Sequence, residues 1–199
     1  MAAVTPERFQ QGMTYEQYRS QMTRNRERLE ANERGTMLSP EELAPFKKLR
    51  QPLRVVVLAE DWCGDVIANL PVLGRLAEET GKLDLRVFLR DQNLDIMDQY
   101  LKEGKYRSIP VFVFLDEGFR EIGRFTERPA TVTAELDRRR RELYAAHPEF
   151  GEPSQPIDQL PEDVRVRLQQ ANAQMRSEMA PFSNAEVVRE LGQITAKAS

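Results

Sequence analysis

The sequence predicts an α/β fold in which a mixed central sheet is flanked by helices, with helical extensions at both ends of the chain. Two apolar runs, the unbroken Val55–Ala59 and the alternating Leu83–Leu89, enclose a helical segment and so predict a β-α-β unit. A third run, Val111–Leu115, is followed by Asp116-Glu117-Gly118, which predicts an antiparallel hairpin. These three observations set the fold class.

The first fifty residues carry helix signals. Thr14 and Gln17 form a capping box, and the stretch from there to about Asn32 contains no Gly or Pro, so it predicts one helix. Its apolar stripe is thin, which is typical of an arm that lies on a domain or on a partner. Ser39 and Glu42 form a second capping box and predict a short helix.

The middle of the chain predicts the element order β-α-β-α-β-β-α. A helix follows Trp62-Cys63-Gly64 and ends at Gly81, and a second helix runs from an Asn93 cap to Gly104. Residues 119–125 are expected to pair with the strand before them. The last helix of this region opens at Pro129 and ends before Pro148.

The end of the chain predicts a linker and two more helices. Gly and Pro residues mark the linker between 148 and 161, a helix follows, and Ser183 with Glu186 forms a capping box that predicts a further helix start. We therefore expect an N-terminal helical extension over residues 1–50, a central domain over 51–147, and a linker with a C-terminal helical extension over 148–199.

Composition narrows the function classes. The chain has 199 residues, is 40% hydrophobic and carries a formal net charge of −3, so nucleic acid and anionic membranes are not expected partners. There is no run of ~20 apolar residues and no apolar signal core at the start, which makes the cytoplasm the expected location. One Cys and one His exclude an internal disulfide and an ordinary structural zinc site, and no cofactor is expected.

Three motifs resemble those of the thioredoxin-like superfamily. Trp62-Cys63-Gly64 lies between a buried strand and a helix, Pro71 follows eight residues after the cysteine, and Ile109-Pro110 precedes an apolar strand. The resemblance implies a thioredoxin fold with Pro110 as a cis-proline that faces the cysteine. It implies Cys63 as the catalytic residue, and the residues expected to contact a substrate are Trp62, Gly64, Asp65, Ser108, Ile109 and Pro110.

The position of Cys63 has a physical rationale, and its surroundings depart from the family pattern. A cysteine at a helix N-terminus lies beside unpaired N–H groups and the positive end of the helix dipole, which favour the thiolate. Val66 stands where thioredoxins have a second cysteine, and Val57 where they bury a carboxylate. Asp65 stabilises the helix start but opposes a nearby thiolate, so the sequence leaves the reactivity of Cys63 open.

Other charged residues are expected to be structural. Glu60, Asp61, Asp65 and Asp91 are expected to be solvated around the site rather than to bind a metal. His147 is expected to meet the last carbonyls of a helix. The run of four arginines at 138–141 is expected to be a solvated helix face with Glu135 and Glu142 as partners.

These observations lead to one main hypothesis and two alternatives. The main one is a single-cysteine thiol-disulfide oxidoreductase that acts on a protein or small-molecule disulfide, with an external low-molecular-weight thiol as reductant. The alternative is a redox-inactive binding module, whose groove or helical ends hold a partner protein or a second copy of the chain. A glutathione-transferase-like enzyme is a weaker alternative, because about fifty C-terminal residues are few for its helical domain.

Overall fold

The computed structural model describes residues 4–198, which divide into two compact units. Unit 1 contains the described residues up to Arg128 together with those from Val187 onward, and unit 2 spans Pro129–Glu186. The predicted boundaries at 50/51 and 147/148 fall inside these units.

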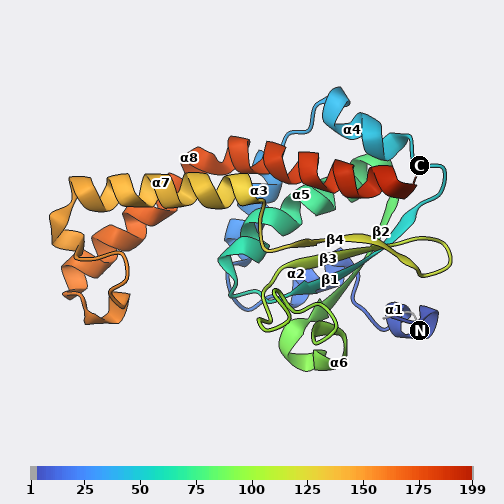
Figure 1. The fold of residues 1–199 in the computed structure, drawn as a ribbon, viewed down its shortest axis with the longest axis horizontal. Helices are drawn as coiled ribbons and strands as arrows, with labels where there is room; N and C mark the ends of the chain where they lie inside the picture. Colours follow the sequence, from blue (N-terminus) through green and yellow to red (C-terminus); the bar gives the residue numbers. More distant parts are fainter. Residues whose placement is uncertain (1–3, 199) are drawn as a thin grey trace. The chain divides into compact units, whose positions relative to one another are not determined.

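A four-stranded mixed sheet forms the centre of unit 1 (Figure 1). The strand order is β2-β1-β3-β4, with β1 parallel to β2 and antiparallel to β3, and with β3 antiparallel to β4. Its strands are β1 (Leu53–Ala59), β2 (Leu83–Leu89), β3 (Val111–Leu115) and β4 (Glu121–Thr126). The predicted α/β class with a mixed sheet is confirmed.

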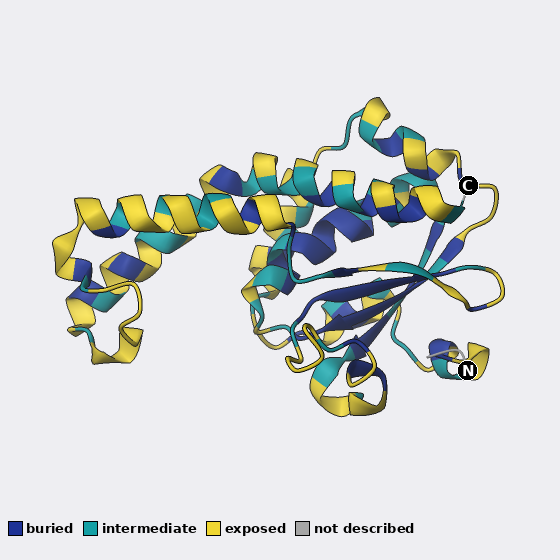
Figure 2. Ribbon diagram, in the orientation of Figure 1, coloured by how far each residue is buried: buried dark blue, intermediate teal, exposed yellow. Residues whose placement is uncertain are grey.

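The sheet is buried because its central strands are apolar on both faces. Every residue of β3 is buried, and so is all of β1 apart from Arg54 (Figure 2). The rings of Phe112 and Phe125 stack across β3 and β4 with centroids 5.1 Å apart. This packing fixes the register, since a one-residue slip would turn the apolar side chains of β4 to the opposite face.

Helix α5 (Gly64–Thr80) makes the crossover between β1 and β2 (Figure 1). It starts directly after Cys63, which is its N-cap residue, and Pro71 lies buried inside it. It ends at Gly81, which has φ +63°, a left-handed conformation that glycine adopts without a side-chain clash. The predicted β-α-β unit is therefore confirmed at both helix ends.

The N-terminal helices belong to the same core as the sheet. They are α1 (Pro6–Gln10), α2 (Tyr15–Gln21), α3 (Arg26–Gly35) and α4 (Pro40–Lys47), and α3 and α4 pack on α5. Both predicted capping boxes form, at Thr14 and at Ser39. Tyr18 and Leu29 are fully buried in the unit 1 core, so the apolar stripe of this segment is narrow but its side chains belong to the core.

The single helix predicted from Thr14 to about Asn32 is wrong, because the chain breaks between α2 and α3. The Asp61 carboxylate accepts hydrogen bonds from the backbone N–H groups of Thr23 and Arg24 at 2.8 and 3.0 Å. Asn25 takes a left-handed φ of +54° and its side chain donates to the Asp61 carbonyl. A side chain 38 residues away thus interrupts a locally helical sequence.

The helix predicted from Asn93 to Gly104 is also wrong in length. The structure has the 3₁₀ turn η1 (Arg90–Gln92) and then α6, which spans only Leu94–Met97. The Asn93 side chain does not cap this helix, since it donates to the Leu89 carbonyl and accepts from Arg8. Left-handed residues at Glu103 and Gly104 then turn the chain toward Pro110.

The predicted hairpin forms between β3 and β4, although β4 begins at Glu121 rather than Phe119. The Asp116 carboxylate closes the turn by accepting from the backbone N–H groups of Gly118 and Arg120. The pairing of β3 with β4 has a register shift at Phe114/Leu115. The chain returns along β4 to the end of the sheet where β1 terminates.

Unit 2 contains α7 (Ala130–Ala146), the 3₁₀ turns η2 (Pro148–Phe150) and η3 (Ile157–Gln159), and most of α8 (Glu162–Thr195), after which comes η4 (Ala196–Ala198). Its core is small and consists of Tyr144, Phe150, Val164 and Leu168. The new helix predicted at Ser183 is wrong, because α8 continues through Pro181 without a break. Buried residues on both sides of the proline, Met179 and Val187, support the continuous helix.

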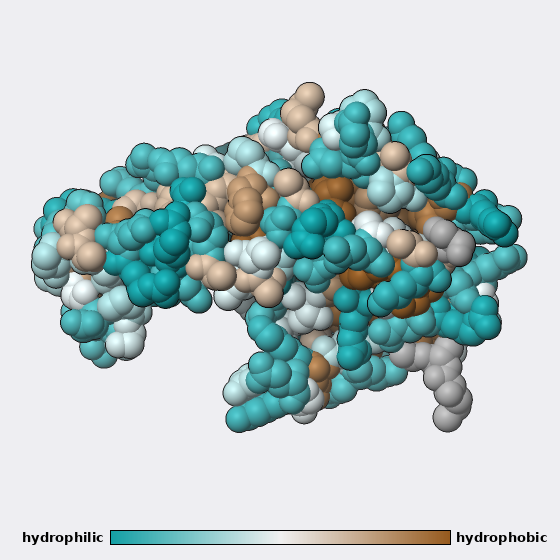
Figure 3. Space-filling model, turned by 45° about the horizontal axis from the view of Figure 1, so that its top comes forward, coloured by the Kyte–Doolittle hydropathy of each residue, from teal (hydrophilic) through white to brown (hydrophobic). Residues whose placement is uncertain are grey.

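The face drawn in Figure 3 is mainly hydrophilic, and hydrophobic residues reach it in separate patches. None of the helices within residues 4–198 has the length and apolar character that crossing a membrane requires.

Candidate functional site

Cys63 lies where three strand ends of unit 1 meet. It follows β1, adjoins the end of β2 and faces the start of β3, because Ala59 pairs with Leu89 and Leu58 pairs with Val111. The residue is half-buried, and as the N-cap of α5 it has an extended backbone. Its thiol donates to the Ile109 carbonyl, with 3.5 Å between Sγ and the oxygen.

The surroundings of Cys63 act on its pKa in opposite directions. Burial is the largest effect and raises the pKa of the thiol. The backbone N–H groups of Val66 and Asp65 lower the pKa by hydrogen bonding to the sulfur, the Asp65 charge raises it, and Arg128 lowers it. The net direction is upward, so the resting group is the neutral thiol at neutral pH.

The proline that faces Cys63 has a cis peptide bond to Ile109, and both residues are buried. Ser108, half-buried, contributes a side-chain hydrogen bond to Glu127. The Pro110 carbonyl accepts from the Glu127 backbone N–H at 2.8 Å. Residues 108–110 therefore form one wall of the site and bond to the segment that follows β4.

Asp65 forms an ion pair with Arg128, whose Nη2 donates to its Oδ2. The two side chains are only 14% and 25% exposed, respectively. The Nε atom of Arg128 is buried and has no hydrogen-bond partner within residues 4–198. The charge that the sequence places beside Cys63 is thus compensated by a residue 63 positions away.

The backbone around Arg128 is held on two sides. Glu127 has a left-handed φ of +59°, and its carbonyl accepts from the Asn69 side chain at 2.6 Å. Asn69 is buried in α5, and the Glu127 carboxylate is bonded by Lys102. Residues 127 and 128 therefore connect α5 to the proline wall.

Trp62 forms the exposed rim of the site, with 44% of its surface accessible. The Arg90 guanidinium lies over its ring at 4.9 Å from the centroid and donates to the Arg107 carbonyl at 3.2 Å. At Gly64, a Cβ atom would meet nothing within 4 Å. The space beside the Gly64 Cα is therefore open.

Apolar, buried side chains occupy the two positions where thioredoxins have a second cysteine and a buried carboxylate. Val66 and Val57 are both fully buried. Neither side chain offers a nucleophile or a proton carrier, so neither can take the place of a second cysteine or of a buried carboxylate.

The expectation that the nearby acidic residues are solvated is wrong for Glu60 and for Asp65, whose side chain is 14% exposed in its ion pair with Arg128. Glu60 is 8% exposed and its carboxylate accepts from the Asp91 N–H at 2.9 Å, while burial raises its pKa. Asp61 fixes the break between α2 and α3, as described above. Within residues 4–198, no group of three or more His, Cys, Asp or Glu side chains is arranged to hold a metal ion.

Sequence reasoning missed Arg128, Asn69 and Tyr18. Tyr18 is fully buried, its hydroxyl has no partner within residues 4–198, and burial and the charges of Asp61, Glu60 and Cys63 raise its pKa. No local signal marks these residues, because each meets the site from another element. Thr-Glu-Arg-Pro at 126–129 looks like an ordinary strand-to-helix connection.

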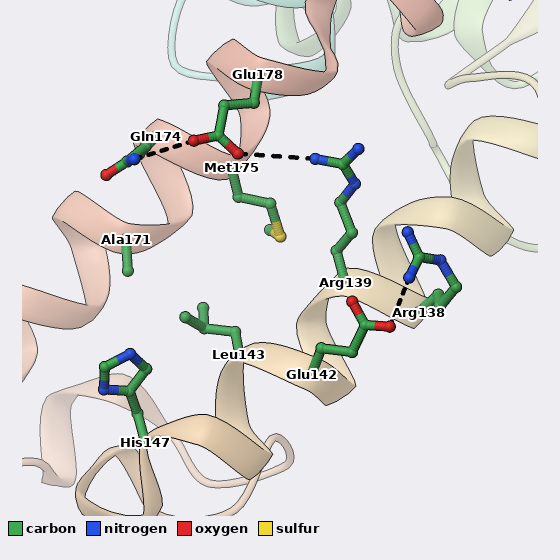
Figure 4. A pocket seen from close by; sticks show the side chains of 9 residues that line it. All are labelled: Arg138, Arg139, Glu142, Leu143, His147, Ala171, Gln174, Met175 and Glu178. Atoms are coloured by element: carbon green, nitrogen blue, oxygen red, sulfur yellow. Dashed lines mark hydrogen bonds and ion pairs between the residues drawn. The ribbon is translucent and has the colours of Figure 1, made fainter.

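Unit 2 has a groove of its own, with a volume of about 390 Å³, between α7 and α8 (Figure 4). Leu143, Ala171 and Met175 form its apolar floor, and the arginines at its rim are paired with Glu135, Glu142 and Glu178, in line with the expected solvated helix face. The expectation that the His147 imidazole meets the last carbonyls of the helix is wrong, because the ring stacks on Phe150 and contacts Glu149. The backbone N–H of His147 donates to the Leu143 carbonyl at the end of α7. The charged side chains that line the groove therefore form their ion pairs within unit 2.

Comparison with known proteins supports the fold at full length. A structure of a Pseudomonas aeruginosa protein of unknown function matches with a TM-score of 0.67 and 18% identity, and the match covers 98% of this chain and 99% of that one. A crystal structure of an HIV epitope-scaffold matches with a TM-score of 0.63, 15% identity and 96% coverage of both chains. A thioredoxin from Fasciola hepatica matches 49% of this chain and 88% of its own at 26% identity, with a TM-score of 0.33.

No curated protein matches the sequence. The sequence model of the thioredoxin family, described as "Thioredoxin", matches residues 12–140, which include α2 to β4, the whole Cys63 site and the start of α7. The match spans well over half of the chain, and the chain therefore belongs to the thioredoxin family.

Proposed function

We propose that this thioredoxin-like protein carries out thiol-disulfide exchange through Cys63 alone. The observation that carries the proposal is the position of the sulfur, which lies at the N-terminus of α5 with two backbone N–H groups directed at it, 3.5 Å from the Ile109 carbonyl beside Pro110. At this helix start the backbone N–H groups favour the thiolate and oppose the burial that raises the Cys63 pKa, and the space beside Gly64 is open to an extended substrate.

The reaction has two steps. The Cys63 thiolate attacks one sulfur of a substrate disulfide, which forms a mixed disulfide and releases the other sulfur as a thiolate that takes a proton from water. An external low-molecular-weight thiol then attacks the mixed disulfide, restores the Cys63 thiolate and leaves with the captured sulfur as a new disulfide. The external thiol is required because Val66 occupies the position of the resolving cysteine.

The direction of the Cys63 pKa predicts how the first step depends on pH. Burial raises the pKa, so only a small fraction of Cys63 is ionised at neutral pH and the capture rate is limited by that fraction. We expect the rate to increase about tenfold per pH unit up to the Cys63 pKa and then to level off.

The test is capture of a defined probe, glutathione disulfide, followed by intact mass spectrometry over a range of pH. We expect one mixed disulfide per chain, release by added thiol, and no adduct in Cys63→Ser. The control is the same chain unfolded in urea, compared at equal thiolate fraction. If native Cys63 reacts no faster than unfolded Cys63 at equal thiolate fraction, the folded site does not promote exchange and the proposal is wrong.

A second candidate is a binding module that uses the same wall without chemistry. The raised Cys63 pKa and the burial of Val57 and Val66 favour it. Under this alternative Cys63→Ala keeps partner binding, whereas the exchange mechanism predicts loss of covalent capture. Retention on immobilised glutathione by Cys63→Ala as well as by the native chain would instead favour a glutathione-transferase-like activity.

A further inference from the structure

The first turn of α5 contains an electrostatic conflict. Asp65 lies two residues after Cys63, and its backbone N–H helps to stabilise a negative sulfur while its carboxylate opposes one. A carboxylate at this position would suppress thiolate formation if it were left uncompensated. The effect of the Asp65 carboxylate on Cys63 therefore depends on the groups that contact this carboxylate.

Arg128 is in contact with this carboxylate and is shielded from solvent. The ion pair is formed by side chains that are 14% and 25% exposed, so water screens it less than it screens a surface pair. The buried Nε–H of Arg128 has no acceptor within the described part of the chain. Arg128 therefore has one donor that Asp65 does not use.

The backbone that carries Arg128 is bonded to both sides of the site. Glu127 donates to the Pro110 carbonyl at 2.8 Å and accepts from Asn69 of α5 at 2.6 Å. These bonds place the guanidinium at the N-terminus of α5. Its location is therefore set by the same wall that faces Cys63.

We infer that Arg128 is a positioning residue of the Cys63 site: by holding the Asp65 carboxylate in an ion pair, it offsets the charge that would otherwise oppose the Cys63 thiolate. The inference rests on the proposed function, because a thiolate matters only if Cys63 reacts. It adds a residue outside the Trp-Cys-Gly motif and the proline loop to the machinery of the site.

The groups around the sulfur agree with this role. From α5 the Asp65 charge raises the Cys63 pKa, and from the segment after β4 the Arg128 charge lowers it. Tyr18 of α2 faces Cys63, Glu60 and Asp61 with a buried neutral phenol whose own pKa is raised by burial, so it stays uncharged when Cys63 ionises. Asp65 and Arg128 are thus the charged side chains that act on the thiol most strongly.

The experiment measures the pH dependence of Cys63 alkylation by iodoacetamide, an uncharged probe that requires no disulfide exchange. Arg128→Gln is expected to lower the thiolate fraction at a fixed pH by about tenfold, and Asp65→Asn to increase it by a similar factor. The double variant should return close to the native profile. Arg128→Lys should recover part of the loss, because it restores the charge without the planar guanidinium.

The matched control is Arg120→Gln. Arg120 is also paired with an aspartate, Asp116, but it lies in the turn at the other end of β3 and is 84% exposed. We expect it to change the profile by less than twofold. This control distinguishes the general effect of removing a paired arginine from the specific effect of removing Arg128 on the Cys63 thiol.

If neither Arg128→Gln nor Asp65→Asn shifts the pH profile, or if both shift it in the same direction, the inference is wrong. Should Arg128→Gln fail to fold, Asp65→Asn alone decides, since it leaves no unpaired buried carboxylate and its predicted shift has the opposite sign. If the pH profiles shift with the expected signs but the native protein does not capture glutathione disulfide, the inference about Arg128 and Asp65 is supported and the proposed function is rejected.

Discussion

Two Asp–Arg pairs lie at opposite ends of β3 and serve different purposes. Asp116 and Arg120 are four residues apart in the hairpin turn, and the Asp116 carboxylate also accepts from the Arg120 and Gly118 N–H groups at 3.0 and 2.8 Å. Asp65 and Arg128 are 63 residues apart, and they join α5 to the segment that follows β4. The first pair closes a turn, and the second pair connects two sides of a candidate reaction site.

The difference lies in what each pair requires from the rest of the fold. The hairpin turn needs only local chain geometry, because an aspartate can bond to backbone N–H groups two and four residues further on. The Asp65–Arg128 pair forms only after β4 has returned alongside β3 and α5 has packed on the sheet. We therefore expect substitutions at the site end of the sheet to have larger effects than matched substitutions elsewhere.

Asn69→Ala should give the largest effect. It removes the buried amide that donates to the part-buried Glu127 carbonyl, and an acceptor left without a partner there costs about 2 kcal/mol of unfolding free energy. Asn32→Ala is the matched control. Asn32 of α3 donates to the Ile67 carbonyl of α5, but Asn32 is exposed, so water can replace its side chain as the donor. Urea denaturation measures both, and equal losses would contradict the comparison.

Arg128→Gln should lower the unfolding free energy by about 1 kcal/mol, because the Asp65 carboxylate loses its charged partner in a site where water has limited access. Arg120→Gln should leave the urea midpoint unchanged, since the Arg120 guanidinium is largely in water and the backbone N–H bonds to Asp116 remain. A destabilisation by Arg120→Gln as large as that by Arg128→Gln would remove the distinction between the two pairs.

The smallest expected effect is a pH dependence from Glu60, the buried carboxyl next to the site. Burial raises its pKa in the folded protein, so the folded state binds this proton more tightly than the unfolded state. Stability from this group is full below the unfolded pKa and decreases as pH rises through the folded value. Glu60→Gln keeps an acceptor for the Asp91 N–H and should remove that decrease, which urea midpoints measured from pH 4 to 8 would detect.

Local sequence signals predicted the elements that local chemistry controls. The capping boxes at Thr14 and Ser39 form because both partners lie within one helical turn. Gly81 ends α5 because its left-handed conformation is intrinsically available to glycine. The same signals failed where another element intervened, as at the α2–α3 break, which Asp61 holds, and at Ser183, which lies within the continuous α8.

The sequence by itself determined the fold class, the family resemblance and the position of Cys63 at a helix start, because apolar periodicity and short motifs specify those features within a few residues. Only the tertiary structure decided what surrounds the sulfur. The burial that raises the Cys63 pKa, the Ile109 carbonyl and the Asp65–Arg128 pair come from segments far apart in the chain. Desolvation and charge depend on distances in space, and spacing along the sequence does not encode them.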